Sequence, residues 1–232
     1  MEKIKKYNKI KNDVQEFIDK FNSVTKDDVI VEEFLQGWRI LYSNIIEDCK
    51  VLLVGINPGS GEDIGTRNYE LDPLESLEYL DNRRNNYSLA NLVKTIFLKA
   101  ELFDVLENSA MKINTKFYAT YGVNEIKGFE KHLAEHFKEI YSELMEKNEK
   151  WITKLVNIVN PKIVIAEGWE AFHFLDDKIF TNENKEWICI KPWNNVVGVW
   201  KRNDGLIFFG FTRRRGNFEN EIAENLKLLI FQ

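Results

Sequence analysis

The sequence has few cysteines, prolines and glycines: its 232 residues include 2, 4 and 12 of them. The two isolated thiols, Cys49 and Cys189, are too few for a disulfide framework or a cysteine metal cluster. Hydrophobic residues make up 44% of the chain and charged residues 30%. Such a composition excludes a disordered chain and supplies enough apolar side chains for a proper core.

The chain also lacks an apolar run of the ~20 residues that a membrane-spanning helix needs. Its charged amino-terminal segment, MEKIKKYNKIKNDVQ, is unlike a secretory signal, so we expect a cytoplasmic protein with no membrane partner. The net charge of −5 excludes a broad electrostatic contact with nucleic acid. Any such contact must be local, and the strongest local excess of basic residues lies between Lys201 and Arg215.

The length favours one domain with an extension. Apolar residues at helical spacing predict an amino-terminal helical extension over residues 1–47, and residues 48–232 are predicted to form one α/β domain. Longer strands are expected at 51–56, 116–123 and 162–167, and shorter ones at 187–190, 196–200 and 206–211. Helices are expected over 87–106, 128–159 and 219–231.

One stretch, VLLVGINPGSG at 51–61, combines a continuous apolar run with a turn rich in glycine and proline. The run predicts a strand buried on both faces, as in a parallel sheet, and ligands bind at the carboxyl ends of such strands. Pro58 stiffens the turn and keeps Asn57 out of helical geometry. Gly55 and Gly59 let another molecule approach the backbone closely.

Several interpretations of this turn are possible. It lacks the Gly-Lys-Ser/Thr of a Walker phosphate loop, and as a dinucleotide fingerprint its third glycine, Gly65, is one position late. An ordinary strand-to-helix turn is a further alternative. Finally, a strand followed by GINPG resembles the first active-site motif of the uracil-DNA glycosylase superfamily, especially its mismatch-specific uracil/thymine branch.

The resemblance implies a three-layer α/β/α sandwich with a mostly parallel central sheet, here preceded by helices. It also implies that Asn57 positions the attacking water and that Gly55, Ile56, Pro58 and Gly59 line the substrate site. No cofactor is expected. No metal is expected either, because His132 and His136 have a zinc-compatible spacing but no evident third ligand.

Two further positions follow from the same resemblance. Tyr69 stands twelve residues after Asn57, where the family has an aromatic residue that stacks on the target base. The alternative is a structural tyrosine whose ring packs against the protein while its hydroxyl contacts solvent. Tyr121 stands where several branches of the family have an asparagine that pairs with the edge of the base. The alternative is that Tyr121 has only a structural role.

The second active-site loop of the family corresponds to FTRRRGNF, which lacks the family's His-Pro-Ser or Asn-Pro-Ser. Thr212 is expected at the substrate. Arg213 and Arg215 are expected to contact nucleic acid, since alternate side chains of an extended segment face the same side. A solvated basic turn is the alternative.

The sequence therefore predicts a DNA glycosylase-like hydrolase that removes a deaminated or mismatched base, most simply uracil, from DNA. The alternative is a catalytically silent protein of the same fold that binds a nucleotide or nucleic acid. A third possibility is an unrelated α/β enzyme acting on a small molecule. The partner is expected to be DNA or a nucleobase or nucleotide ligand, and the protein is expected to be a monomer.

Overall fold

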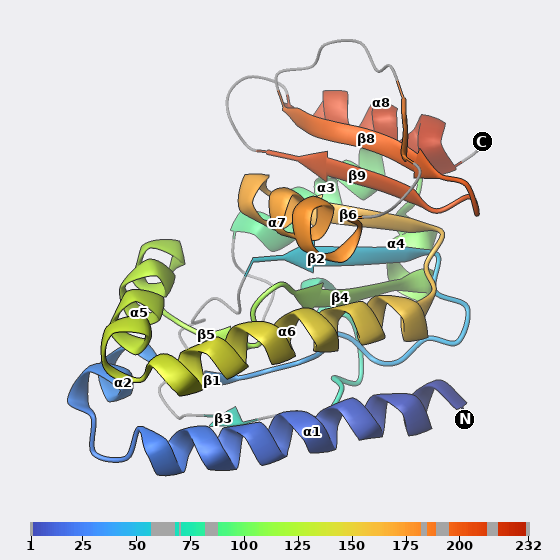
Figure 1. Ribbon diagram of the computed structural model, residues 1–232. Coiled ribbons are helices and arrows are strands. Elements are labelled where there is room, and N and C mark those ends of the chain that lie inside the picture. The colour runs from blue at the N-terminus through green and yellow to red at the C-terminus, as the bar shows by residue number, and fades with distance from the viewer. Residues whose placement is uncertain are drawn as a thin grey trace. The chain divides into compact units, whose positions relative to one another are not determined.

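The computed structural model describes residues 2–56, 68–69, 71–81, 88–181, 185–188, 195–212 and 218–230 (Figure 1). Over these residues the chain is an α/β protein with a six-strand, mostly parallel mixed sheet and eight α-helices. It divides into two compact units. The sheet unit comprises Tyr42–Gly55, Leu74–Ile113 and Val159–Gln232, and the helical unit comprises Met1–Leu41, Ile56–Pro73 and Asn114–Ile158.

The large sheet has the strand order β4-β2-β6-β9-β8-β7. Its strands are β4 (Ala110–Asn114), β2 (Val51–Gly55), β6 (Ile163–Glu167), β9 (Ile207–Phe211), β8 (Val196–Arg202) and β7 (Lys185–Trp187). The strands β2, β6 and β9 are parallel, and β8 and β7 continue the sheet in antiparallel order.

Strand β4 also runs parallel to β2, as the hydrogen bonds at both ends show. Lys50 N donates to Ser109 O just before the two strands begin, and Lys116 N donates to Ile56 O just after they end. The carboxyl ends of β4, β2, β6 and β9 therefore share one edge of the sheet.

Buried apolar runs account for the parallel strands. Every residue of β2 and β9 is buried, and in β6 only the last residue is partly exposed. The predictions of strands at 51–56, 162–167 and 206–211 are confirmed within one residue at their ends.

Helices cover both faces of the large sheet. On one face α3 (Ser88–Lys99) packs beside α8 (Phe218–Ile230), and their apolar residues share a core with Leu53, Ile165 and Phe209 of the strands. The same side of the unit holds α4 (Phe103–Ser109) and the short 3-10 helix η1 (Glu78–Leu80), whose apolar residues join this core.

On the other face α7 (Trp169–Phe174), continued by a π-helical turn at Leu175–Ile179, places Phe172 against Phe208 with ring centroids 4.7 Å apart. This close packing requires glycine in the sheet. A Cβ at Gly210 would lie 2.1 Å from Cδ2 of Phe172, and one at Gly198 would lie 2.7 Å from its Cζ.

The helical unit contains α1 (Glu2–Val24), α2 (Val29–Phe34), α5 (Val123–His136), α6 (Lys138–Val159) and a small sheet of order β3-β1-β5. The strands of that sheet are β3 (Asn68–Tyr69), β1 (Gly37–Trp38) and β5 (Tyr118–Ala119). Its core is aromatic: the rings of Phe17, Trp38 and Trp151 make edge contacts 5.7–6.0 Å apart.

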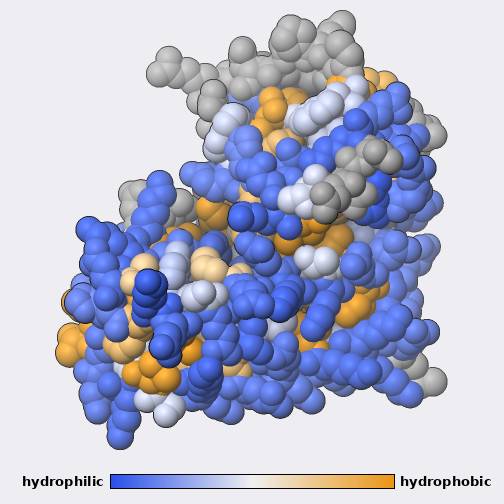
Figure 2. Space-filling view, in the orientation of Figure 1, coloured by the Kyte–Doolittle hydropathy of each residue, from blue (hydrophilic) through white to orange (hydrophobic). Residues whose placement is uncertain are grey.

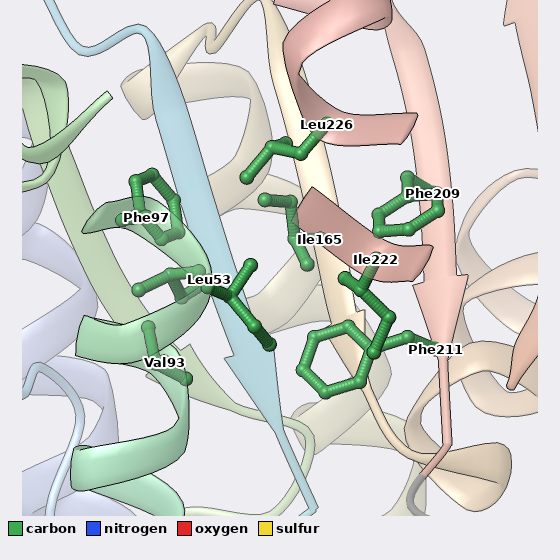
Figure 3. Close-up of a pocket in the computed structure, with 9 residues that line it drawn as sticks. Leu53, Val93, Phe97, Ile165, Phe209, Phe211, Ile222 and Leu226 are labelled. Carbon is green, nitrogen blue, oxygen red and sulfur yellow. The ribbon is translucent and has the colours of Figure 1, made fainter. Parts of the chain in front are cut away.

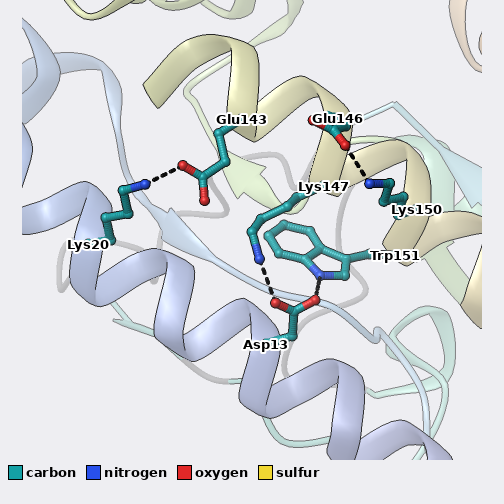
Figure 4. A network of polar contacts seen from close by, with 7 residues as sticks. All are labelled: Asp13, Lys20, Glu143, Glu146, Lys147, Lys150 and Trp151. Carbon is teal, nitrogen blue, oxygen red and sulfur yellow. Dashed lines mark hydrogen bonds and ion pairs between the residues drawn. The ribbon is translucent and has the colours of Figure 1, made fainter. Parts of the chain in front are cut away.

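Polar contacts join α1 to α6 within the helical unit (Figure 4). Asp13 accepts hydrogen bonds from Lys147 Nζ at 2.6 Å and from Trp151 Nε1 at 2.8 Å, and Lys20 pairs with Glu143. Burial raises the pKa of Asp13, but the hydrogen bonds from Lys147 and Trp151 outweigh it, so that the pKa lies below its usual value.

Four expectations about elements were wrong. Residues 37–47 contain no helix and begin with β1. The helix expected over 87–106 is two helices, α3 and α4. The helix expected over 128–159 consists of α5 and α6, with an interruption at Phe137. Strand 116–123 is reduced to β5 in the small sheet, while β4 takes the place beside β2. The break between α3 and α4 has a local cause, since Glu101 has φ +59° and cannot continue a helix.

The division between residues 47 and 48 stays a prediction. No helix among the described residues is long and apolar enough to cross a membrane.

The face in Figure 2 is mostly hydrophilic, with a group of apolar residues over the region of α2 in Figure 1. In this region Val29 is 70% exposed.

Candidate functional site

The carboxyl-terminal edge of the large sheet is where open parallel sheets bind ligands. Val54 of β2 stands opposite Ala166 of β6, so Gly55 and Glu167 are the next residues along the two strands. Glu167 in turn stands opposite Phe211 of β9, and Thr212 follows. Gly55, Glu167 and Thr212 thus lie at one edge of the sheet unit.

Glu167 is held in place by Tyr79 of η1. The Tyr79 hydroxyl donates to both carboxylate oxygens, at 2.8 Å from Oε1 and 2.7 Å from Oε2. Tyr79 is fully buried and Glu167 is partly exposed. A buried donor on a partly exposed carboxylate fixes the orientation of the acid.

Lys112, in the middle of β4, supplies a buried positive charge to the same group of side chains. Its Nζ donates to Glu78 Oε2 at 2.8 Å and lies 4.1 Å from the ring centroid of Tyr79 and 5.1 Å from that of Tyr42. We call Tyr42, Glu78, Tyr79, Lys112 and Glu167 the Lys112 cluster.

The Lys112 side chain is only 6% exposed. Burial alone would lower the pKa of Lys112, but the negative charges of Glu78 and Glu167 outweigh it, so the pKa lies above its ordinary value. The ammonium group is therefore charged at neutral pH.

The segment after β2 is anchored in the helical unit at its first residue. The Ile56 carbonyl accepts hydrogen bonds from Lys116 N at 2.9 Å and from Thr115 Oγ1 at 2.8 Å. Asn148 of α6, itself buried, donates through Nδ2 to the Thr115 carbonyl at 2.6 Å. These bonds fix the point from which the predicted active-site turn departs.

A second lysine cluster belongs to the helical unit. Lys116 Nζ lies 2.9 Å from Glu130 Oε1, and the Tyr118 hydroxyl donates to the same oxygen. Burial and the Glu130 charge raise the pKa of Tyr118 well above its ordinary value. We call Lys116, Tyr118 and Glu130 the Lys116 cluster.

The predicted site residues fall into three groups. Asn57, Pro58, Gly59, Arg213 and Arg215 lie outside the described residues. Gly55 and Thr212 lie at the carboxyl edge of the sheet unit, where Thr212 N donates to the Asn195 carbonyl at 2.7 Å. The others, Ile56, Tyr69 and Tyr121, belong to the helical unit.

The backbone of Tyr69 pairs with Trp38 in the small sheet, and its side chain lies outside the description. Tyr121 is 63% exposed. The roles predicted for both tyrosines stay predictions.

Sequence reasoning missed Glu167. The signal was a single acid that ends the apolar run KIVIAE immediately before Gly168. An acid at the carboxyl end of a buried parallel strand projects at the ligand-binding edge. Gly168 has φ +130°, a conformation that favours glycine, and it turns the chain sharply from β6 into α7.

The Lys112 cluster lines neither of the two cavities described below. One, of about 10 Å³, is a gap between the sheet and the helices α3 and α8 (Figure 3). It is lined by apolar side chains such as Leu53, Phe97 and Leu226, and so small an apolar gap does not hold a ligand. The other, a groove of about 230 Å³ beside the turn from α1 to α2, includes Thr25 and Glu32.

Within the described ranges no group of three or more His, Cys, Asp or Glu side chains is arranged to hold a metal ion. His132 and His136 have ring centroids 4.6 Å apart, and His132 Nε2 lies 3.0 Å from Asp28 Oδ1. The histidine pair is thus part of a contact between α5 and the start of α2.

No protein-family model matches this sequence, and no curated protein matches it either. Function therefore has to be argued from the residues and from the geometry of the carboxyl edge.

Proposed function

We propose that this chain is a glycosylase-type hydrolase that releases a deaminated or mismatched base, most simply uracil, from DNA. The proposal includes a three-layer α/β/α sandwich of the uracil-DNA glycosylase type. The helices on both faces of a mostly parallel sheet are compatible with that architecture.

One observation carries the proposal. The strand that precedes GINPG is a fully buried parallel strand, and Gly55 ends it at the carboxyl edge of the sheet. A turn that leaves this edge can present Asn57 to a ligand, as the resemblance of the motif requires. If GINPG had followed a surface helix or joined the two strands of a hairpin, the motif would not stand at a ligand-binding edge, and this support would be lost.

In the proposed reaction the base is extruded from the stack into the site. Asn57 holds the attacking water. Tyr69 stacks on the base, and Gly55, Ile56, Pro58, Gly59, Tyr121 and Thr212 line the substrate site. Charge stabilisation of the departing base is the largest energetic demand on such a site.

The experiment is an incubation of purified protein with oligonucleotides that carry a single uracil, hypoxanthine or mismatched thymine, followed by alkali cleavage. Wild-type protein should produce strand breaks at one of these bases, and Asn57→Ala should abolish them without lowering the melting temperature. Equal turnover by Asn57→Ala would remove the role of this turn in base release.

A catalytically silent binding protein is the second candidate. The observation that favours it is the sequence FTRRRGNF, which lacks the Pro-Ser of the family's second motif. The same assay separates the two functions. Affinity for a uracil-containing oligonucleotide without any base release would favour the binding protein.

Arg213 and Arg215 are proposed to contact phosphates of the DNA. Each phosphate contact contributes about one unit to the slope of log affinity against log salt concentration. Replacing both arginines with alanine should flatten that slope by roughly two units. A slope that the double substitution leaves unchanged would assign DNA binding to another surface.

A further inference from the structure

Hydrolysis of a base–sugar bond needs a group that accepts a proton from the attacking water. The amide of Asn57 can hold a water molecule but cannot take its proton. If the proposed function is correct, a carboxylate or an imidazole near the carboxyl edge of the sheet would accelerate this step. The role suits an acid that is held in one orientation and partly open to solvent.

Glu167 combines these properties. It ends β6 at the carboxyl edge, beside the strand that leads to Asn57, and it is partly exposed. The Tyr79 hydroxyl contacts both of its oxygens at 2.7–2.8 Å, and the Lys112 charge acts on it through the protein interior. The buried side of the cluster thus orients Glu167.

Other acids of the sheet unit are less suited to this role. Glu78 is bound to the buried ammonium of Lys112 at 2.8 Å. Glu221 accepts hydrogen bonds from Asn195 N and Nδ2 at the start of α8, and Asp176 is bound to Lys185 and Trp200. None of these three acids ends a parallel strand at the carboxyl edge of the sheet.

We infer that Glu167 is the catalytic base of this protein, an inference that rests on the proposed glycosylase function. A water oxygen forms a bond to C1′ of the sugar while the C1′–N bond breaks, and the electron pair of that bond leaves with the base. One proton of the water passes to an Oε atom of Glu167. The base anion takes a proton from solvent, and Glu167 later returns its own proton to solvent.

Tyr79 is a positioning residue in this scheme, because it acts through Glu167. Its hydroxyl donates to the ionised form of the acid, so that removing it makes protonation of Glu167 easier. Tyr79→Phe should therefore move the acid limb of the pH–rate profile to higher pH. A merely structural tyrosine would change stability and leave the position of that limb unchanged.

The test measures single-turnover base release by wild type, Glu167→Gln and the matched control Glu170→Gln, an exposed acid three residues later on α7. Each variant is assayed below its melting temperature, and its affinity for the uracil oligonucleotide is measured separately. Glu167→Gln should lose on the order of 10²–10⁴-fold in rate, the usual contribution of a general base. Its affinity should stay near wild type, and Glu170→Gln should keep the wild-type rate.

The outcomes separate the two claims. A wild-type protein that releases no base from any of the oligonucleotides would overturn the proposed function and this inference together. An active wild type with an equally active Glu167→Gln would overturn the inference alone. A Glu167→Gln protein whose slower release is matched by an equal loss of affinity would also overturn it, because a base acts on the chemical step.

Discussion

The Lys112 and Lys116 clusters are built from the same residue types, and their lysines are four positions apart in the sequence. In each a lysine ammonium lies 2.8–2.9 Å from a glutamate, and a buried tyrosine donates to a carboxylate. They differ in how many acids take part. In the Lys116 cluster Glu130 alone accepts from both lysine and tyrosine, whereas in the Lys112 cluster lysine binds Glu78 and tyrosine binds Glu167.

Under the proposed function, this difference separates a structural acid from a catalytic one. Glu130 is paired with Lys116 in the helical unit. Glu167 ends a parallel strand at the edge where open sheets bind ligands. Comparing matched substitutions in the two clusters therefore tests the distinction directly.

The largest expected effect on stability comes from Lys112→Met. This change leaves Glu78, whose side chain is 18% exposed, without its ammonium partner, and breaking such a mostly buried pair costs about 3 kcal/mol of unfolding free energy. Lys116→Met should cost only about 1–2 kcal/mol, since Glu130 keeps the hydrogen bond of Tyr118. Urea unfolding at pH 7 measures both, and equal losses would contradict the greater dependence of the Lys112 cluster on its cation.

A smaller effect is expected for the tyrosines. Loss of a hydrogen bond to a charged group costs about 1.5–3 kcal/mol. Tyr118→Phe should lie near the lower value because Lys116 still binds Glu130 at 2.9 Å, and Tyr79→Phe should lie near the upper value. Urea unfolding of the two single variants measures this difference, and the reverse order would show that Glu130 depends more on its tyrosine than Glu167 does.

The smallest effect is expected at the start of α2 in the helical unit, and its size depends on pH. Asp28 accepts from Val31 N at 2.8 Å and from His132 Nε2 at 3.0 Å. Burial raises the pKa of Asp28, but these hydrogen bonds outweigh it and the pKa lies below its usual value. Because the folded-state pKa is depressed, the stabilisation is present above the unfolded pKa of ~3.9 and is lost as the pH falls through the folded pKa.

Asp28→Asn should therefore lower the melting temperature at pH 7, and the difference from wild type should shrink as the pH falls below about 4. The neighbouring exposed acid provides the control, because Asp27→Asn should show no such pH dependence. A difference between Asp28→Asn and wild type that stays constant from pH 7 to pH 3 would mean that the Asp28 charge contributes nothing to the contact.

The parallel strands could be predicted from the sequence because their residues are locally informative. Val51–Val54 and Ile163–Ala166 are continuous apolar runs, and the burial they predict is the burial observed. By contrast β4, with the sequence AMKIN, has a lysine in its centre. The burial of that lysine depends on Glu78, which is 34 residues away in the sequence. The local sequence pattern therefore does not predict this strand.

The Lys112 cluster could not be predicted for the same reason. Tyr79 and its acceptor Glu167 are 88 residues apart, and only the fold brings η1 to the end of β6. The predicted helix boundaries were wrong at single residues such as Glu101 and Phe137. There the helical spacing of apolar residues continues in the sequence although the backbone helix is interrupted. The turn with Asn57 was found from its motif, and its chemistry stays a prediction.

The most direct test of the difference between the clusters is base release by Glu167→Gln and Glu130→Gln, measured side by side on a uracil oligonucleotide. Both substitutions remove one negative charge from an acid that accepts a hydrogen bond from a buried tyrosine. The account predicts that Glu167→Gln loses on the order of 10²–10⁴-fold in rate while Glu130→Gln stays close to wild type. Equal rates for the two variants, whether both high or both low, would contradict it.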